Sequence, residues 1–272
     1  MTALFEYNIN DVRPYINWVY FYHAWGLSGK PASEKAALRS EAETILAGLG
    51  DLYHTHAVFG LFPANSDGDD IIINGVRLPF LRQQNRKADG EPNLCMADFI
   101  RPLSSGVSDR IGVFATSVDA GMEKYHDDDD YLKMMSQTLA DRLAEATAEK
   151  LHEDVRRRYW GYAEHENLSV SEMLNAGYCG IRPAVGYPSM PDMSLNFILS
   201  ELVDMPKIGI RLTESGAMQP HASVSGLMLA HPKAVYFDVG HIGEDQLRDY
   251  ASSPRHTGKD DAPFSFQPVC DM

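Results

Sequence analysis

The stretch "AVFGLFPANSDGDDIIINGVRLPFL", residues 57–81, decides the fold class. Turn-forming residues interrupt its apolar runs twice, at Asn65 to Gly68 and at the Asn74-Gly75 pair. Because an Asn-Gly pair between apolar runs is typical of a tight β-hairpin, the stretch predicts strand, turn, strand, hairpin and strand. Strands that follow one another through hairpins favour an antiparallel sheet.

Helical patterns lie on both sides of this stretch. Ser169 and Glu172 form an S-x-x-E capping box that begins one short helix. Longer helices are predicted at 31–50, at 132–155 behind the acidic run His126 to Asp130, at 192–205 and at 243–251. Further strands are predicted at 110–118, 207–213, 221–230 and 234–240. Since the strands cluster instead of alternating with helices, we predict an α+β fold with an antiparallel sheet rather than a doubly wound parallel sheet.

The composition indicates one acidic domain. The chain has 272 residues, of which 44% are hydrophobic, enough for a sizeable core. We expect a domain over residues 1–251 and a tail over residues 252–272, where proline, serine and charged residues gather. The 24 Lys and Arg against 38 Asp and Glu give a formal net charge of -14. Such a charge repels phosphate backbones and anionic lipids, so neither nucleic acid nor a membrane is expected as a partner.

The cysteines suggest a cytoplasmic location. Cys95, Cys179 and Cys270 lie far apart and form neither a CxxC pair nor a disulfide framework, which suits a reducing compartment. No apolar run approaches the roughly 20 residues of a membrane span. The N-terminus also lacks the basic and apolar regions of a signal peptide.

Common catalytic motifs are missing from the sequence. No Gly-x-Gly-x-x-Gly follows a strand, and neither a phosphate loop nor a Gly-x-Ser-x-Gly elbow is present. Two Glu-x-x-His pairs, Glu123 with His126 and Glu149 with His152, have the spacing of di-iron ligands. We favour solvated helix faces for both pairs, because a di-iron site needs two more ligand helices, but a metal-dependent enzyme stays open as an alternative.

Two further groups of side chains leave alternatives open. Glu145, Glu149 and His152 share one face of the long helix by their spacing, and Glu145 faces either solvent or a cleft. Six aromatic residues lie between Tyr15 and Trp25. Because such rings bury much area, we expect this aromatic cluster to belong to the core rather than to a ligand platform.

The stretch "GIRPAVGYPSMPD", residues 180–192, sets a single arginine among prolines and glycines. The prolines stiffen the segment, Gly186 lets the backbone approach a ligand, and Tyr187 offers a flat face. A fixed guanidinium binds a carboxylate through two parallel hydrogen bonds. Two interpretations of Arg182 remain open: a site for a small zwitterion with a carboxylate, or structural pairing with a helix carboxylate such as Glu172.

At this point the sequence resembles a known family. "RPAVGYP", residues 182–188, is similar to the R-P-x-x-G-Y-P signature of the activation domain of cobalamin-dependent methionine synthase. Other long blocks agree in order, among them "YINWVYFYHAW", "LADRLAEATAEKLHEDVRRRYWGYA" and "LTESGAMQPHASVSGLMLAHP". The resemblance runs from Val12 to Ala251 and implies a single C-shaped domain with a twisted antiparallel sheet flanked by helices.

The resemblance also implies a function. Such a domain binds S-adenosylmethionine and positions its methyl group for the reductive methylation of cob(II)alamin to methylcobalamin. The cobalamin is carried by a partner domain, and flavodoxin or a flavoprotein reductase donates the electron. The domain is part of a methyltransferase and is not expected to make methionine alone. An acidic flavodoxin would have to meet local basic patches such as Arg156 to Arg158.

The family's functional residues are carried over by position. The resemblance implies that Arg182 binds the methionyl carboxylate, that Tyr187 lies beside the transferred methyl group, and that Glu145 supports the site. The remaining implied ligand-binding residues are Asn17, Ala184, Gly186, Tyr236 and Phe237.

Asn17 departs from the family pattern, which often has Asp in this block to meet the ligand's ammonium group. An amide lacks charge assistance, so affinity is expected to fall by about 1 kcal/mol. Asn17 also keeps a second hypothesis open, in which the chain is a non-catalytic relative that uses the fold as a binding module.

Overall fold

The structure, a computed structural model, describes residues 2–252. Residues 253–272, which make up all but the first residue of the predicted tail and include Cys270, lie outside the described residues. The helices are α1 (Ile9–Val12), α2 (Trp18–Ala24), α3 (Ala32–Leu49), α4 (Asp130–Asp154), α5 (Val170–Leu174), α6 (Leu195–Val203) and α7 (Glu244–Ser252). The strands are β1 (Thr2–Asn8), β2 (His54–Asp67), β3 (Asp70–Ile73), β4 (Val76–Pro79), β5 (Asp109–Val118), β6 (Arg211–Leu212), β7 (Met218–Gln219) and β8 (Ser223–Met228).

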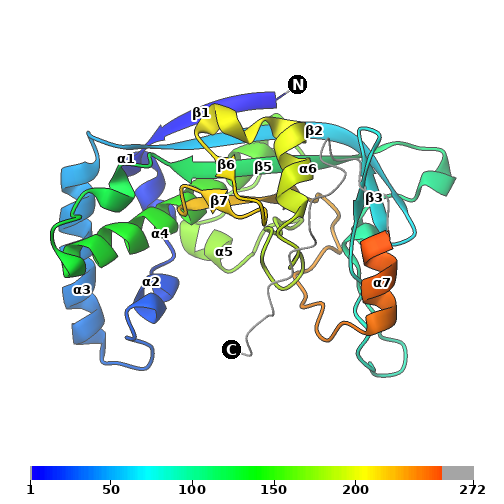
Figure 1. Cartoon of the computed structure of the whole chain (residues 1–272), viewed down its shortest axis with the longest axis horizontal. Coiled ribbons are helices and arrows are strands. Elements are labelled where there is room, and N and C mark those ends of the chain that lie inside the picture. The colour runs from blue at the N-terminus through cyan, green and yellow to red at the C-terminus, as the bar shows by residue number, and fades with distance from the viewer. Residues whose placement is uncertain (1, 253–272) are drawn as a thin grey trace.

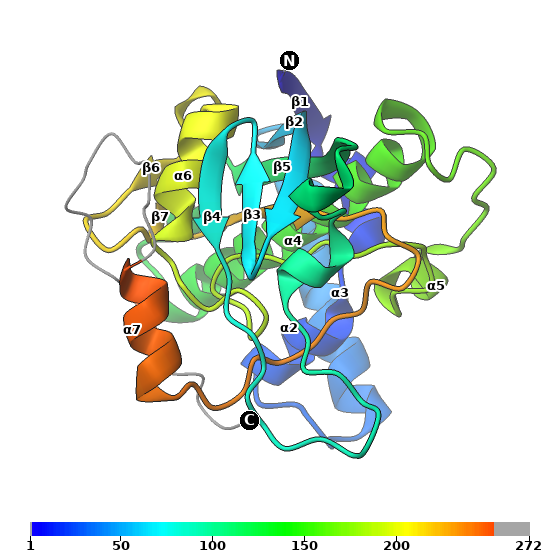
Figure 2. The same cartoon turned by 90° about the vertical axis from the view of Figure 1, so that its right-hand side faces the viewer.

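The main sheet has six strands and is antiparallel throughout. Its order is β4-β3-β2-β5-β8. β1 pairs with the first half of β2, on the same edge of β2 that pairs with β3 in its second half. Figure 2 shows β4, β3 and β2 side by side. The opening stretch therefore forms β2, β3 and β4, with Asn74 and Gly75 in the hairpin turn as predicted.

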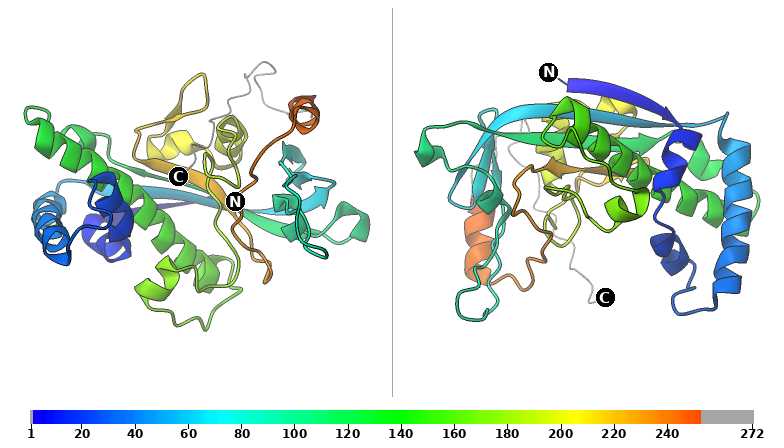
Figure 3. Two further views of the ribbon diagram at one scale, coloured as in Figure 1. Left: turned by 90° about the horizontal axis from the view of Figure 1, so that it is seen from below. Right: turned by 180° about the vertical axis from the view of Figure 1, so that it is seen from behind.

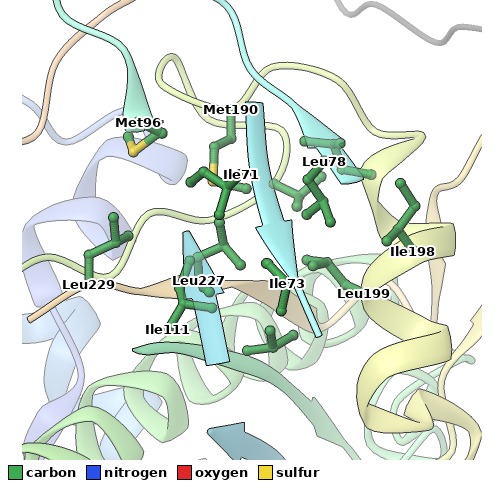
Figure 4. Close-up of a cluster of buried hydrophobic side chains, with 14 of the residues drawn as sticks. Ile71, Ile73, Leu78, Met96, Ile111, Met190, Ile198, Leu199, Leu227 and Leu229 are labelled. Carbon is green, nitrogen blue, oxygen red and sulfur yellow. The ribbon is translucent and has the colours of Figure 1, made fainter. Parts of the chain in front are cut away.

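Helices cover both faces of this sheet. α4 packs against β5, β2 and β8 on one face, and α6 packs against the same strands on the other. Successive residues of β5 alternate between the two sides, so that the Thr116 hydroxyl donates to the carbonyl of Ala144 in α4 and the Ser117 hydroxyl donates to that of Ile208. Figure 4 shows the core on the α6 side, where Leu199 lies beside Ile73 and Leu227 lies beside Ile111.

The overall shape is an arch. In Figure 1 the long strands β2 and β5 run across the top, with α3 descending at one end and α7 at the other, and Figure 3 shows the same arch from behind. The predicted α+β fold with a twisted antiparallel sheet in a C-shaped domain is confirmed.

The long predicted helices are also found. The acidic run before α4 serves as its start, because the Asp129 side chain accepts a hydrogen bond from the backbone N–H of Leu132 at 2.9 Å. α4 continues into a π-helix over Val155–Tyr159. The Ser169 and Glu172 capping box is present at the start of α5, with both reciprocal hydrogen bonds.

Two predicted strands are wrong. Of residues 207–213 only the two residues of β6 are extended, because Pro206 lies in a 3-10 helix over Met205–Ile208. Residues 234–240 form no strand, and the Val239 N–H bonds to the carbonyl of Pro188 instead of a ladder partner. Ala234, Phe237 and Val239 of this segment pack against the core, whereas Val235 is exposed. The sequence analysis also missed β1.

Candidate functional site

The proline-containing segment 181–185 lies along the outer edge of β8. The N–H of Val185 donates to the carbonyl of Ser225 at 2.9 Å, and the N–H of Leu227 donates to that of Pro183 at 3.0 Å. Isolated bridges join Ile181 to Leu229 and Ala184 to Gly226. The segment thus extends the sheet irregularly, which edge positions allow for proline.

Glycines make this close approach possible. A Cβ on Gly226 would lie 2.1 Å from the carbonyl oxygen of Pro183, so no larger residue fits between the strand and the segment. Gly180 and Gly186 flank the segment with φ of +84° and +87°, in the left-handed region that favours glycine. Arg182 is therefore fixed at its Cα by the sheet edge.

A cavity of about 330 Å³ opens beside this segment, between it, α4 and the N-terminal end of α2. The cavity brings together Asn17, Glu145, Arg182, Ala184, Tyr187 and Tyr236, all predicted as site residues. Gly186 and Phe237 are not among the lining residues. The remaining lining residues are Tyr15, Tyr20, Arg142, Glu149, Leu174, Ala176, Tyr178, Pro183 and Ser189.

Arg182 is almost completely buried, with 7% of its surface exposed. Its Nη2 donates to Oε1 of Glu149 at 2.5 Å, and its guanidinium lies 5.6 Å from the ring centroid of Phe114. Within the described residues, neither Nε of Arg182 nor Oε2 of Glu149 has a hydrogen-bond partner. Burial alone would lower the pKa of Arg182, but the charge of Glu149, helped by smaller contributions, raises it above its usual value. The guanidinium therefore stays charged.

The helix carboxylate that pairs with Arg182 is thus Glu149, whereas the sequence analysis had suggested Glu172. Glu172 is engaged in the capping box of α5. Glu145 and Glu149 both line the cavity, which answers the question whether Glu145 faces solvent or a cleft. Arg142 lies on the same face of α4, three residues before Glu145, and this spacing was the signal that could have identified it.

Tyr187 and Glu145 form a pair at the mouth of the cavity. The Tyr187 hydroxyl donates to Oε1 of Glu145, and 48% of the tyrosine is exposed. Burial of the hydroxyl, followed by the nearby Glu145 charge, raises the pKa of Tyr187 above its usual value. Tyr187 is therefore a neutral hydrogen-bond donor at neutral pH and no general base.

Tyr236 and its neighbour Phe237 point to different surroundings. The Tyr236 hydroxyl accepts a hydrogen bond from the backbone N–H of Arg182 at 2.9 Å and lies 3.1 Å from the hydroxyl of Tyr178. Phe237 packs instead against the core, with its ring centroid 6.4 Å from that of Phe99. Of these two neighbouring residues, only Tyr236 lines the cavity.

Asn17 has a structural role in the fold that the sequence analysis missed. It is the N-cap of α2, and its Oδ1 accepts a hydrogen bond from the N–H of Val19 at 3.1 Å. Asn is among the preferred N-cap residues, so its position before a helix was a usable signal.

The aromatic cluster is only partly core. Phe21 is buried, and Trp18, Tyr22 and Trp25 pack against the core. Tyr20 differs, because 61% of it is exposed and it lines the cavity.

The two Glu-x-x-His pairs are separate and differently engaged. Glu123 accepts a hydrogen bond from the N–H of Ala222, and His126 lies 2.9 Å from the hydroxyl of Ser136. His152 is fully buried, and burial, followed by the charges of Arg156 and Arg182, lowers its pKa well below the usual value. Among the described residues, no group of three or more His, Cys, Asp or Glu side chains could hold a metal ion.

The basic patch proposed around residue 156 is smaller than expected. Arg156 is fully buried and binds Glu166, which leaves Arg157 and Arg158 at the surface. Between residues 2 and 252, no helix combines the length and apolar character needed to cross a membrane.

Comparisons with known proteins identify relatives of this chain. The family model of the activation domain of vitamin B12 dependent methionine synthase matches residues 8–255. A crystal structure of the MetH reactivation domain bound to AdoHcy is similar, with a TM-score of 0.85 and 39% sequence identity. The match covers 92% of this chain and 85% of that chain.

Proposed function

Because the chain belongs to the activation domain family of vitamin B12-dependent methionine synthase, we propose that its cavity binds S-adenosylmethionine and presents the methyl group to a partner domain. The observation that carries the proposal is the charged, buried Arg182, whose guanidinium is only partly used by Glu149. The similar structure with bound AdoHcy, the demethylated form of this ligand, supports it.

The residues around the cavity fit such a ligand. Its volume of about 330 Å³ is in the range of small-molecule sites, which begin at about 300 Å³. S-adenosylmethionine carries a carboxylate, an ammonium group and a sulfonium. Arg182 would match the carboxylate through charge-assisted hydrogen bonds, and Asn17 would face the ammonium group. The negative charges of Glu145 and Glu149 favour a ligand with positive groups in this cavity.

The aromatic residues would hold the rest of the ligand. Tyr236, which is 45% exposed and lines the cavity, has a ring suited to stacking on an adenine, and Ala184 lines the same cavity. Tyr187 would lie beside the methyl group, held in one orientation by Glu145. Gly186 and Phe237 would act indirectly, Gly186 through the turn and Phe237 through the core contact that supports the neighbouring Tyr236.

The contribution of this chain to the reaction would be positioning. S-adenosylmethionine supplies the methyl group, and a cobalamin on a partner domain accepts it with an electron from flavodoxin or a flavoprotein reductase. The chain's own residues orient the donor and exclude water around its charged end, and no proton has to be removed by the protein. We therefore do not expect the chain to make methionine alone.

We also propose a cytoplasmic location. Cys95 and Cys179 are free thiols, as a reducing compartment allows.

Calorimetric titration with S-adenosylmethionine tests the proposal. Wild type should bind saturably, and Arg182→Ala should weaken binding by at least tenfold, because a charge-assisted hydrogen bond contributes about 1.5–3 kcal/mol. Asn17→Asp should strengthen binding about fivefold, since Asp caps a helix as well as Asn and adds charge toward the ligand's ammonium group.

Arg77→Ala is the matched control. Arg77 also pairs with carboxylates, those of Asp67 and Asp70, but lies outside the cavity. Equal loss of binding in Arg77→Ala and Arg182→Ala, or no binding by wild type and Asn17→Asp at millimolar ligand, would contradict the proposal.

A further inference from the structure

Tyr178 lines the cavity beside Tyr236 and Arg182, the two residues with which it is linked by hydrogen bonds. Its hydroxyl is 3.1 Å from that of Tyr236, and the Tyr236 oxygen accepts the backbone N–H of Arg182 at 2.9 Å. A chain of two hydrogen bonds thus runs from Tyr178 through Tyr236 to the backbone of Arg182.

Tyr178 itself is held firmly. Its ring lies 4.3 Å from the guanidinium of Arg156 and 4.7 Å from the ring of His152, which contacts it edge-on. Arg156 is fixed in turn by three hydrogen bonds to Glu166. The Tyr178 hydroxyl is therefore presented from a rigid, buried support.

Tyr236 has no such support of its own. It lies in a segment without helix or strand, and almost half of it is exposed. The segment's backbone is anchored nearby, where Val239 bonds to Pro188 and the carbonyl of Asp238 accepts from Gln83. These contacts fix the main chain but leave the rotation of the Tyr236 side chain to its phenol hydrogen bonds.

We propose that Tyr178 is a positioning residue of the ligand site, which acts by fixing the phenol of Tyr236 and, through it, the backbone at Arg182. This inference rests on the proposed function of the cavity. A phenol oxygen accepts two hydrogen bonds. When Tyr236 accepts from both Arg182 and Tyr178, its own O–H is free to donate to a ligand acceptor.

The protonation state of Tyr178 allows it to be the donor in this hydrogen bond. Burial, followed by the charge of Tyr236, raises the pKa of Tyr178 above its usual value. Tyr178 thus stays protonated across the physiological pH range, and its O–H can donate a hydrogen bond to the Tyr236 oxygen.

The test compares Tyr178→Phe with Tyr162→Phe. Both changes remove one hydroxyl from the same cluster, but the Tyr162 hydroxyl makes a 3.4 Å contact with His152 and does not line the cavity. In calorimetry with S-adenosylmethionine and S-adenosylhomocysteine, Tyr178→Phe should weaken binding about fivefold, and Tyr162→Phe should leave it unchanged.

A double-mutant cycle shows whether Tyr178 acts through Tyr236. In the Tyr236→Phe background the Tyr178→Phe change should cost nothing further, because the hydroxyl on which it acts is gone. A full fivefold loss in that background would mean that Tyr178 touches the ligand directly, and wild-type affinity in Tyr178→Phe would mean that it has no role. Either result overturns the inference.

Amide hydrogen exchange tests the inference without ligand. The Arg182 amide should exchange several times faster in Tyr178→Phe than in wild type or in Tyr162→Phe, because its acceptor is less well fixed. Unchanged exchange would overturn the positioning role even if the wild-type chain binds the ligand. Faster exchange without any ligand binding would contradict the proposed function and leave the hydrogen-bond chain itself supported.

Discussion

The two buried arginines near the cavity differ in how completely their partner carboxylates are bonded. Arg156 bonds to both carboxylate oxygens of Glu166 through three contacts of 2.6–3.0 Å and covers the ring of Tyr178. Arg182 makes one contact with Glu149, and a nitrogen of the arginine and an oxygen of the glutamate are left without partners among the described residues. Nη1 of Arg156 also lacks a partner among the described residues, but both oxygens of Glu166 are bonded. The second pair leaves a carboxylate oxygen unbonded as well, and both of its residues line the cavity.

The difference shows how a stable fold can keep a charged binding group in place. Burying an ion pair is costly unless its hydrogen bonds are satisfied, and in the Arg182 pair both partners keep a buried polar atom unsatisfied. Arg182 and Glu149 both line the cavity. A ligand carboxylate could supply what Glu149 does not.

The largest expected effect is on stability, in the pair of Arg156 and Glu166. Glu166→Ala should lower the free energy of unfolding by about 3–5 kcal/mol, because it leaves Arg156 buried without its partner. Glu149→Ala should lower the free energy of unfolding by less, because water from the cavity can solvate the Arg182 guanidinium once the glutamate side chain is removed. Urea denaturation of both variants measures this, and equal losses would show that the two pairs are energetically alike.

A smaller loss is expected from Gly226→Ala. The added Cβ would meet the Pro183 carbonyl oxygen at 2.1 Å, so segment 181–185 must move and Arg182 with it. We expect a loss of about 1–3 kcal/mol in stability and weaker ligand binding.

Gly48→Ala is the control for this change. A Cβ at Gly48 meets no atom within 4 Å, and alanine favours the helix α3 in which Gly48 lies. Equal thermal stability of Gly226→Ala and wild type would rule out the tight contact between the segment and β8.

The smallest effect concerns His152, whose pKa is lowered by burial and then by both arginines, Arg156 and Arg182. Its folded pKa lies below the ordinary value of 6.5, so the unfolded chain takes up a proton first as pH falls. The folded chain is therefore fully stabilised by the neutral His152 ring above pH 6.5. As the pH falls from 6.5 to 5, the free energy of unfolding should decrease by about 1–2 kcal/mol.

Unfolding measured at several pH values checks this. The slope of stability against pH in that window should be shallower in His152→Leu than in wild type. NMR titration of the His152 ring in the wild-type chain gives the same information if the variant folds poorly. A ring that titrates near 6.5 would contradict the expectation.

The sequence predicted the parts of the fold that depend on local patterns. The Asn74-Gly75 hairpin, the capping box at Ser169 and the long helix α4 follow from turn chemistry, capping and periodicity. The strand predicted at 234–240 failed because apolar residues in an irregular segment that packs on the core resemble a strand.

The candidate site depended more on tertiary structure. Arg182 was singled out from its stiff surroundings and from the family signature, but the choice of Glu149 over Glu172 as its partner depends on how α4 lies across the sheet. The role of Tyr178 likewise depends on a contact with a residue 58 positions away. Neither spacing nor composition contains that information.

The most direct measurement is a crystal structure of this chain with S-adenosylhomocysteine. We predict that the ligand carboxylate lies within hydrogen-bond distance of Arg182, while Arg156 and Glu166 keep their contacts unchanged. A ligand bound elsewhere, or one whose carboxylate points away while Arg182 contacts only Glu149, would contradict the claim that Arg182 is kept open for a ligand.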